Sequence, residues 1–182
     1  MVTIRLATPD DFVAVRELTT AAYVTAGHID PNSSYAQTLV DMAARQDGLY
    51  VAEVDGAIAG AVNFVPPGSQ KSQVAYDNEG EFRMLAVAPH YQGRGVGRAL
   101  VQFALDMAQS QGLDRVAITT MASMTSAQAM YEAMGFHRAP ERDWNLYTAG
   151  LAEDPEGLET FMVYVHPLNS TTSSKGDSWL TT

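Results

Sequence analysis

The feature that most constrains this chain is a strand, a glycine-spaced loop and a helix that follow one another between residues 79 and 111. Residues 84–87 read MLAV, an apolar run typical of a strand that is covered on both faces. Glycines alternate at positions 93, 95 and 97, and a helical pattern then runs from Val96 to Gln111. This order predicts an anion site, because the first amides of a helix have no intrahelical partner and the helix dipole is positive there.

Other phosphate-binding motifs do not fit this loop. No Lys-Ser or Lys-Thr follows the glycines, as the P-loop requires. The G-x-G-x-x-G spacing of dinucleotide-binding folds fails because position 98 is Arg. Glycine nevertheless suits phosphate binding, because it lacks a Cβ and accepts a positive φ at little cost. A glycine-rich turn that merely caps a helix is the alternative, and the strand before it and a second motif make it the weaker one.

The composition bears on several function classes. The formal net charge is −10, which argues against a nucleic-acid surface, because such a surface needs clustered Lys and Arg. The charge suits a cationic partner or, equally well, a generally solvated acidic surface. The chain has no cysteine, and its four histidines are scattered without ligand spacing, so we expect no metal site.

The length is that of a single domain with a sizeable core. The chain has 182 residues, of which 46% are hydrophobic and 18% charged. We expect a domain over residues 2–167 and a C-terminal tail, rich in Ser and Thr, over 168–182. No run of about 18 apolar residues occurs and the first residues lack a signal-peptide pattern. We therefore expect neither a membrane span nor a membrane partner, and a cytoplasmic location.

Capping and turn signals predict the first half of the fold. A helix should begin after Thr8, which is followed by Pro and two acidic residues. A second helix should begin at Ser34, since Ser34 and Gln37 have the capping-box spacing, and end near residue 46. Asp55-Gly56 predicts a tight hairpin between strands 49–54 and 57–65.

Strands and helices alternate between residues 81 and 136, which indicates an α/β core with a locally parallel part. The expected strands and helices not yet named are strands 2–6, 81–87, 115–120 and 158–165, a strand from residue 136, and a helix over 125–134.

A second motif supports the glycine loop. Residues 127–136 read AQAMYEAMGF, which fits A-x-x-x-Y-E-x-x-G-F, while residues 92–97 fit Q-x-x-G-x-G after a strand ending in L-A-V-x-P. The two motifs resemble those of the GNAT superfamily of N-acetyltransferases, in the same order and about 35 to 40 residues apart. The resemblance covers roughly residues 2–167. Residues 135–144, GFHRAPERDW, are similar to a group of bacterial GNAT proteins of unassigned substrate.

The resemblance implies a fold and a cosubstrate. The fold is α/β (α+β), with a mixed, mostly antiparallel central sheet flanked by helices and splayed between its fourth and fifth strands. Acetyl-CoA, the acyl donor, would lie in the gap between these strands, with no metal required. Many relatives dimerise, so a homodimer is compatible with the resemblance.

The resemblance also assigns residues to the acyl donor. Leu85 and Val87 would offer backbone groups to the pantetheine arm, which pairs like an added strand, with Ala86 at the bend between them. The glycine loop would bind the pyrophosphate through backbone N–H groups, and Arg94 or Arg98 could add charge. The full set is Leu85, Ala86, Val87, Gln92, Gly93, Arg94, Gly95, Val96, Gly97 and Arg98.

Two residues take catalytic positions in the resemblance. Glu81, six residues before Val87, stands where many members have a general base, and a solvated carboxylate at a strand end is an equally weighted alternative. Tyr131 stands where many members have the acid that protonates the leaving thiolate, and a core tyrosine is the alternative. One departure is Met124, where the family often has an Asn that contacts CoA. Arg83 and Glu132 are interpreted as surface charges.

These assignments predict an acyltransferase that moves an acetyl group from acetyl-CoA to a primary amine of a small molecule. A peptide or protein acceptor, through an N-terminus or a lysine, is one alternative. A non-catalytic acyl-CoA-binding module is another, because Met124 replaces the expected Asn. Acceptor specificity would lie in the segments 23–33, 70–80 and 138–157.

Overall fold

The computed structural model describes residues 1–150, 153 and 158–168. Its centre is a seven-stranded sheet in the order β1-β2-β3-β4-β5-β7-β6, in which only the β4–β5 pair is parallel. The strands are β1 (Val2–Leu6), β2 (Leu49–Val54), β3 (Ala57–Val65), β4 (Glu79–Val87), β5 (Arg115–Met121), β6 (His137–Arg138) and β7 (Phe161–Pro167). The helices are α1 (Phe12–Thr20), α2 (Ser34–Val40), α3 (Met42–Arg45), α4 (Val96–Ser110) and α5 (Thr125–Ala133).

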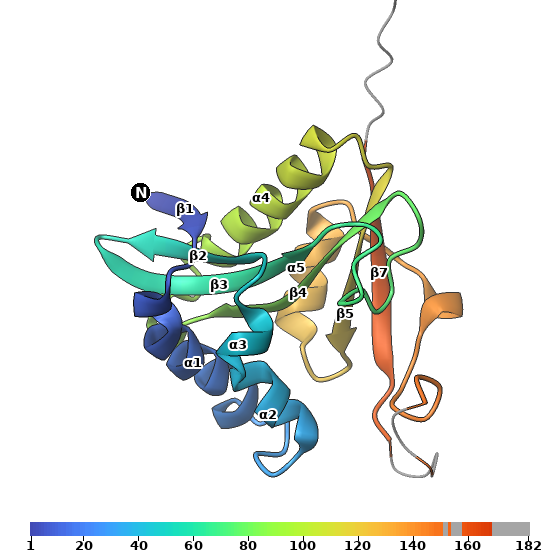
Figure 1. Cartoon of the computed structure of the whole chain (residues 1–182), viewed down its shortest axis with the longest axis horizontal. Coiled ribbons are helices and arrows are strands. Elements are labelled where there is room, and N and C mark those ends of the chain that lie inside the picture. The colour runs from blue at the N-terminus through green and yellow to red at the C-terminus, as the bar shows by residue number, and fades with distance from the viewer. Residues whose placement is uncertain (151–152, 154–157, 169–182) are drawn as a thin grey trace, which may run out of the picture.

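The sheet is covered on both faces, as Figure 1 shows, with α1, α2 and α3 on one side and α4 and α5 on the other. Two apolar cores result. Leu100 and Val101 of α4 pack with Phe136 and Tyr164 in the first core, and Leu18 of α1 packs with Leu39 of α2 in the second. Burial of these side chains drives the assembly, since each contributes about 1.5 to 3 kcal/mol when fully removed from water.

The sheet opens between β4 and β5. These strands pair only from Glu79 with Arg115 to Phe82 with Ile118. Beyond that point β5 stays paired with β7 as far as Met121, while β4 stays paired with β3. The splayed, mostly antiparallel sheet expected from the sequence is confirmed.

Several boundaries differ from the sequence expectations. The second helix is capped by Ser33, not Ser34, because the Ser33 side chain accepts a hydrogen bond from Ala36 N. That helix ends at Val40, since Asp41 leaves the helical conformation and caps α3 through Ala44 N. Strand β4 begins two residues earlier than expected, at Glu79, and β7 covers Phe161–Pro167 in place of 158–165.

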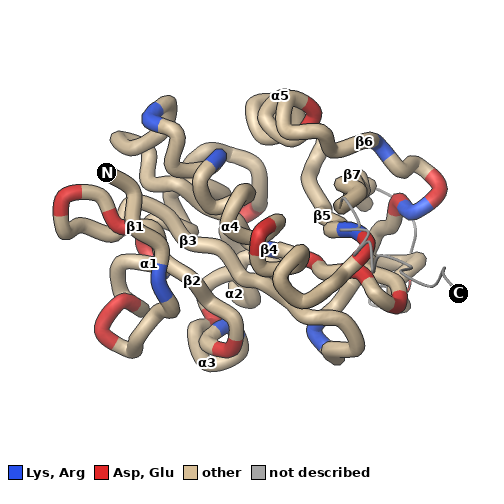
Figure 2. The backbone as a smooth tube through the Cα atoms, turned by 90° about the horizontal axis from the view of Figure 1, so that it is seen from above, with Lys and Arg blue, Asp and Glu red and all other residues tan. Residues whose placement is uncertain are grey.

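The expectations for a membrane span and for the C-terminal tail can be compared with the described residues only. In the part of the chain that the structure describes, no helix is long and apolar enough to cross a membrane. The expected tail lies outside the described residues, apart from Leu168, whose N–H donates to Asp114 O at 2.8 Å. Figure 2 shows basic and acidic residues interspersed along the described backbone, without a region where Lys and Arg gather.

Candidate functional site: a cleft and a chamber at the opened sheet

A β-bulge shapes β4 where the sheet opens. Ala61 of β3 faces Ala86 and Asn63 faces Arg83, so Met84 and Leu85 together oppose the single residue between Ala61 and Asn63. Met84 has a φ of 54°, the left-handed region that side chains rarely adopt. The bulge turns part of the β4 backbone out of the ladder. The edge of β4 that faces β5 has no strand partner after Phe82. Of the carbonyls on this stretch, Leu85 O accepts from the Tyr23 hydroxyl at 2.9 Å and Val87 O accepts from Gln92 Nε2 at 3.4 Å.

A cleft of about 780 Å³ lies in this opening. One wall is the end of β4, a second is the loop that leads into α4, and a third is the start of α5. The family resemblance predicts that ten residues bind the acyl donor. All of them except Arg94 line the cleft. Further lining residues are Ala22, Tyr23, Ala26, His28, Tyr91, Ser123, Met124, Thr125, Ser126, Ala127 and Met130.

The N-terminus of α4 supplies free amides to this cleft. The first hydrogen bond of the helix runs from Ala99 N to Gly95 O and is 2.9 Å long. The amides of residues 93 to 98 donate no hydrogen bond to a backbone group of the described residues. Gly93 and Gly95 have φ values of 73° and 80°. A Cβ added to either glycine would meet no atom within 4 Å, so both face open space. Free amides at a helix N-terminus can donate hydrogen bonds to an anion.

The two arginines of the loop differ. Arg98 lines the cleft, where its guanidinium can add charge to the amides. Arg94 does not line it, and its guanidinium carbon lies 5.5 Å from the centre of the Tyr91 ring. Of the two arginines proposed from sequence, Arg98 has the better position for binding an anion.

Tyr131 lies at the base of the opening and does not line the cleft, although Met130 before it does. Its buried ring packs edge-on against Phe82, with 5.9 Å between ring centres, and in a tilted arrangement against Phe136 at 5.7 Å. Burial raises the pKa of Tyr131, so its hydroxyl keeps its proton across the neutral range. The ring of Tyr131 is therefore part of the core, as the alternative interpretation expects. Its hydroxyl stays the candidate proton donor.

Glu81 is fully buried, with 0% exposure. Its Oε2 accepts hydrogen bonds from Ser72 Oγ and from the backbone N–H groups of residues 73, 74 and 75, at 2.9 to 3.2 Å. Its Oε1 accepts none from the described residues, and Arg83 Nε lies 3.6 Å away. The alternative of a solvated carboxylate is wrong, because the loop 66–78 covers this side chain and is anchored by it.

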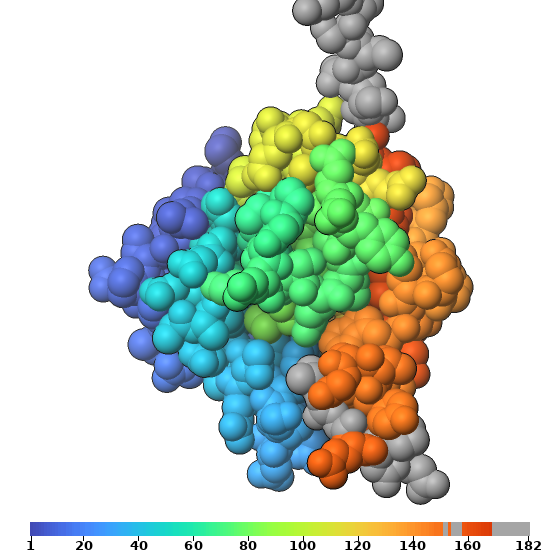
Figure 3. Space-filling model, turned by 45° about the vertical axis from the view of Figure 1, so that its right-hand side comes forward, coloured from blue at the N-terminus to red at the C-terminus, as the bar shows by residue number. Residues whose placement is uncertain are grey.

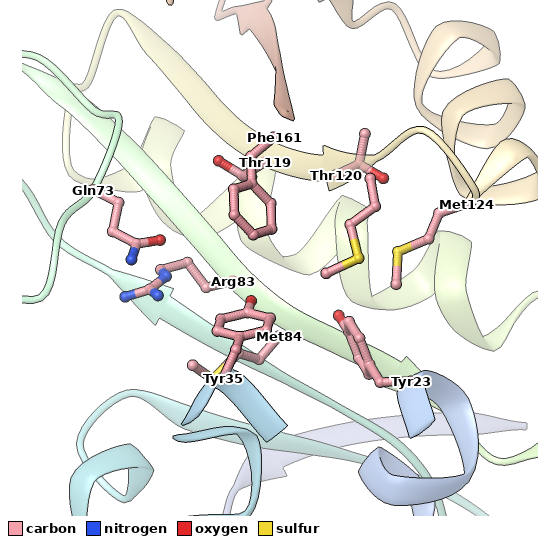
Figure 4. A pocket seen from close by; sticks show the side chains of 10 residues that line it. Tyr23, Tyr35, Gln73, Arg83, Met84, Thr119, Thr120, Met124 and Phe161 are labelled. Carbon is pink, nitrogen blue, oxygen red and sulfur yellow. The ribbon is translucent and has the colours of Figure 1, made fainter. Parts of the chain in front are cut away.

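A small chamber of about 30 Å³ adjoins the cleft on the α1 and α2 side of the sheet. Figure 4 shows Arg83 and Gln73 at one end and Tyr23 and Met124 at the other. Tyr23 and Met124 line the cleft as well, so they form the junction of the two spaces. The complete lining is Tyr23, Tyr35, Gln73, Arg83, Met84, Thr119, Thr120, Met121, Met124 and Phe161.

Two lining residues of the chamber can be compared with expectations from the sequence. Arg83 was interpreted as a surface charge, but its side chain is only 15% exposed and lines the chamber. Tyr23 is the first residue of the segment 23–33, expected to carry acceptor specificity, and it belongs to a π-helical turn, Ala21–Thr25, that continues α1. The buried Tyr23 hydroxyl donates to Leu85 O at 2.9 Å. Burial, and then the nearby Tyr35 and Tyr131 phenols, raise the pKa of Tyr23.

Sequence patterns could not have found the rest of the chamber. Tyr35 lies on α2, Thr119 on β5 and Phe161 on β7, and no motif links these positions. Figure 3 shows how distant segments meet on this side, with the green loop region between the light-blue helices and the orange C-terminal segment. Among the described residues, no group of three or more His, Cys, Asp or Glu side chains could hold a metal ion.

Comparisons with known proteins agree with this geometry. N-acetyltransferase family 8 member 3 of Rattus norvegicus is 33% identical over 95 residues, which cover 50% of this chain and 39% of that protein. The chain thus spans less than half the length of this relative. The ribosomal-protein-S18-alanine N-acetyltransferase from Escherichia coli has a similar structure, with a TM-score of 0.64, 23% identity and full coverage of both chains.

A second structure similar to this one is yncA from Salmonella typhimurium with its cofactor acetyl-CoA. The TM-score is 0.65 at 20% identity, over 94% of this chain and 96% of that one. The model of the acetyltransferase (GNAT) family matches residues 12–136, which contain both sequence motifs and every residue assigned from them. The chain with the opened sheet and the amide-lined cleft is therefore a member of the acetyltransferase (GNAT) family.

Proposed function

We propose that this protein transfers the acetyl group of acetyl-CoA to a primary amine of a small molecule. The observation that carries the proposal is the shared cleft. Residues assigned to the acyl donor from two separate stretches of sequence, the end of β4 and the glycine loop, line one space at the opened sheet. Family membership adds support, since a GNAT structure of similar fold holds acetyl-CoA.

The cleft fits acetyl-CoA on three counts. Its volume of about 780 Å³ is in the range of sites for cofactor-sized ligands. The free amides and Arg98 suit the diphosphate, and Cβ atoms at Gly93 or Gly95 would take up space that the phosphates need. The edge of β4 at Leu85 and Val87 suits the amide groups of the pantetheine arm, which would pair as an added strand. The bound thioester would supply the acetyl group.

The reaction requires that the amine lose a proton before its nitrogen attacks the thioester carbonyl, since an amine with a pKa near 10 is mostly protonated at neutral pH. We propose Glu81 as the acceptor of this proton, through a relay that ends at Oε1. Oε2 is occupied by four hydrogen-bond donors, whereas Oε1 has no hydrogen-bond partner among the described residues. The carboxylate is thus held in one orientation with one free oxygen.

The remaining steps use groups of β4 and α5. Attack forms a tetrahedral oxyanion, which a backbone N–H at the β4 bulge would stabilise. Collapse of this intermediate forms the amide, breaks the C–S bond and releases the CoA thiolate. Tyr131 would donate a hydrogen bond to that sulfur as its negative charge develops, because its raised pKa keeps the hydroxyl protonated. Any proton that it passes to the thiolate would have to be replaced from solvent.

A peptide or protein acceptor is the second candidate. It is favoured by the likeness to an enzyme whose acceptor is an alanine of a ribosomal protein. The small volume of the chamber, about 30 Å³, favours the small acceptor, because a peptide needs a continuous groove. A non-catalytic acyl-CoA-binding module is the third candidate, and it predicts binding of CoA without turnover.

The test combines calorimetry and kinetics on the full chain. CoA and acetyl-CoA are titrated first, and acetyl-CoA is then mixed with panels of amino acids, polyamines, aminoglycosides and peptides while free thiol is recorded. Binding with turnover of a small amine supports the proposal. Turnover of peptides alone supports the second candidate, and binding without turnover supports the third. Absence of CoA binding would contradict all three.

A further inference from the structure

We infer that the acceptor amine carries a carboxylate and that Arg83 binds this carboxylate in the chamber. The inference rests on the proposed function and narrows its substrate class to amino acids and related amino carboxylates. It follows from the position of Arg83, from its free hydrogen-bond donors and from the polarity of the chamber.

Arg83 places a charge inside the chamber. Its side chain is 15% exposed and stands on β4, next to the Met84 bulge and two residues before Leu85 of the cleft. Its guanidinium brings a positive charge to the wall of the chamber. The nearest carboxylate is that of Glu81, whose Oε1 lies 3.6 Å from Arg83 Nε.

Most N–H donors of the Arg83 guanidinium have no hydrogen-bond partner among the described residues. Nη1 donates to Lys71 O at 2.8 Å, and Nε lies 3.6 Å from Glu81 Oε1, which is beyond hydrogen-bond distance. Nη2 donates to no residue that the structure describes, although an arginine carries five N–H donors. Glu81 balances part of the charge, but its Oε2 is taken by the loop 66–78. The outer edge of the guanidinium therefore remains able to bind a carboxylate through two parallel hydrogen bonds.

The charged and amide side chains of the chamber lie at one end, and the hydroxyls of Tyr23 and Thr120 lie toward the other. Arg83 and the Gln73 side chain share the first end, and Tyr23 and Met124 form the end that joins the cleft (Figure 4). A volume of about 30 Å³ has room for one small group, such as a carboxylate, and the rest of the acceptor would lie toward the junction. This orientation directs the carboxylate to Arg83 and the amine toward the cleft that would hold the thioester.

The aromatic and sulfur-containing side chains around the middle of the chamber fit the same class of acceptor. Tyr35, Met84 and Phe161 surround the path between Arg83 and the junction. Methionine side chains are adaptable and polarisable, so they can make room for side chains of different shape. The chamber thus recognises the carboxylate by its charge and tolerates acceptors with different side chains.

The experiment compares acceptors that differ only in this group. Common amino acids, their carboxamides and their decarboxylated amines are offered to the full chain with acetyl-CoA, and kcat and KM are measured for each. We expect kcat/KM for the preferred acid to exceed that of its carboxamide by about 10- to 100-fold, the range of a charge-assisted hydrogen-bond pair. Equal or better turnover of the carboxamide would overturn the inference and favour a peptide N-terminus.

Variants separate recognition from folding. Arg83→Gln should raise KM for the acid by about 10- to 100-fold, leave kcat within about twofold and leave the carboxamide unchanged. Arg83→Lys should recover part of the loss, since it keeps the charge without the two parallel bonds. The control is Arg16→Gln, an exposed arginine on α1, which should change nothing. A loss in Arg83→Gln that is equal for acid and carboxamide would contradict the inference.

A binding measurement distinguishes failure of this inference from failure of the proposed function. If no amine is acetylated, the proposed function fails. N-acetyl amino acids and N-acetyl amino-acid amides are then titrated into the protein in the presence of CoA. Tighter binding of the acids, lost in Arg83→Gln, would support the carboxylate site by itself. Equal binding, or none, would overturn it.

Discussion

The cleft and the chamber meet at Tyr23 and Met124, yet they are built in different ways. The cleft uses backbone amides, glycines and a strand edge, and half of its lining residues come from one continuous stretch, residues 85–98. The chamber uses side chains from α2, β4, β5, β7 and the loop 66–78. A site made of backbone depends on local geometry, whereas a site made of side chains depends on packing. The donor site should therefore tolerate side-chain changes that alter acceptor choice.

The largest effect is expected on the chamber side, at Glu81. Glu81→Gln removes the proposed proton acceptor, so kcat/KM should fall by about 10²- to 10⁴-fold, with CoA affinity within about twofold. Gln also places a donor where four donors now converge, which should lower the free energy of unfolding by about 1 to 3 kcal/mol.

Glu79→Gln is the matched control for Glu81. Glu79 lies two residues away, is equally buried and accepts a hydrogen bond from Arg142 Nη2 at 2.7 Å. Its replacement should lower the free energy of unfolding by a similar or larger amount, while kcat/KM of the folded protein stays within about twofold. If both variants lose activity only in proportion to unfolding, Glu81 is an anchor of the loop and not a base.

The next effect should isolate the cleft. Gly95→Ala places a methyl group where an added Cβ meets no protein atom within 4 Å, so it should block the phosphates and weaken CoA binding by about 100-fold. It also costs about 1 kcal/mol, because Gly95 has a φ of 80°. Calorimetric titration of CoA measures the first effect and thermal unfolding measures the second.

Gly112→Ala controls for the backbone strain. Gly112 has a φ of 71° and open space around it, but it follows α4 at the far end of that helix from the cleft. Both variants should lose similar stability, and only Gly95→Ala should lose CoA affinity. A loss of CoA affinity in both would show that the effect is one of folding.

A smaller effect on kcat is expected at Tyr131, whose ring lies in the core at the base of the cleft. Tyr131→Phe keeps the aromatic packing and removes the hydroxyl, so kcat should fall about tenfold while stability changes little. The decrease is modest because a thiol with a pKa near 8.5 leaves readily as thiolate. Tyr164→Phe, on a neighbouring ring 6.4 Å away, is the control and should retain full kcat. A Tyr131→Phe enzyme with unchanged kcat would assign this tyrosine to the core alone.

The smallest effect is expected far from both spaces. Arg5 binds both carboxylate oxygens of Asp11 and lowers the Asp11 pKa to about 2, against the opposing effect of burial. A lowered pKa stabilises the fold above the unfolded value near 3.9, and this contribution is lost as the pH falls toward 2.

Asp11→Asn should therefore reduce the free energy of unfolding by about 1 to 2 kcal/mol at pH 7 and by little at pH 2, with kinetics unchanged. The figure is discounted because the Arg5 side chain is 37% exposed. Denaturant unfolding at the two pH values measures it. The same loss at both would show that the pairing does not act through ionisation.

Local signals predicted much of the fold because each acts over a few residues. The strands Val2–Leu6, Leu49–Val54 and Ala57–Val65 match their expected ranges, since alternation and the Asp55-Gly56 turn depend on near neighbours. The break of the second helix at Asp41 was missed, because the apolar pattern continues through it. Only the caps at Ser33 and Asp41 show that two short helices fit this face of the sheet.

The sequence by itself determined the family, the glycine loop and the strand that precedes it, because free amides at a helix start depend on the order of adjacent residues. Only the tertiary structure decided what surrounds Glu81 and Arg83. Both were open to interpretation as solvated charges, and both are covered by the loop 66–78. Burial and charge partners come from segments far apart in the chain, so they exist only once the sheet and its loops have packed.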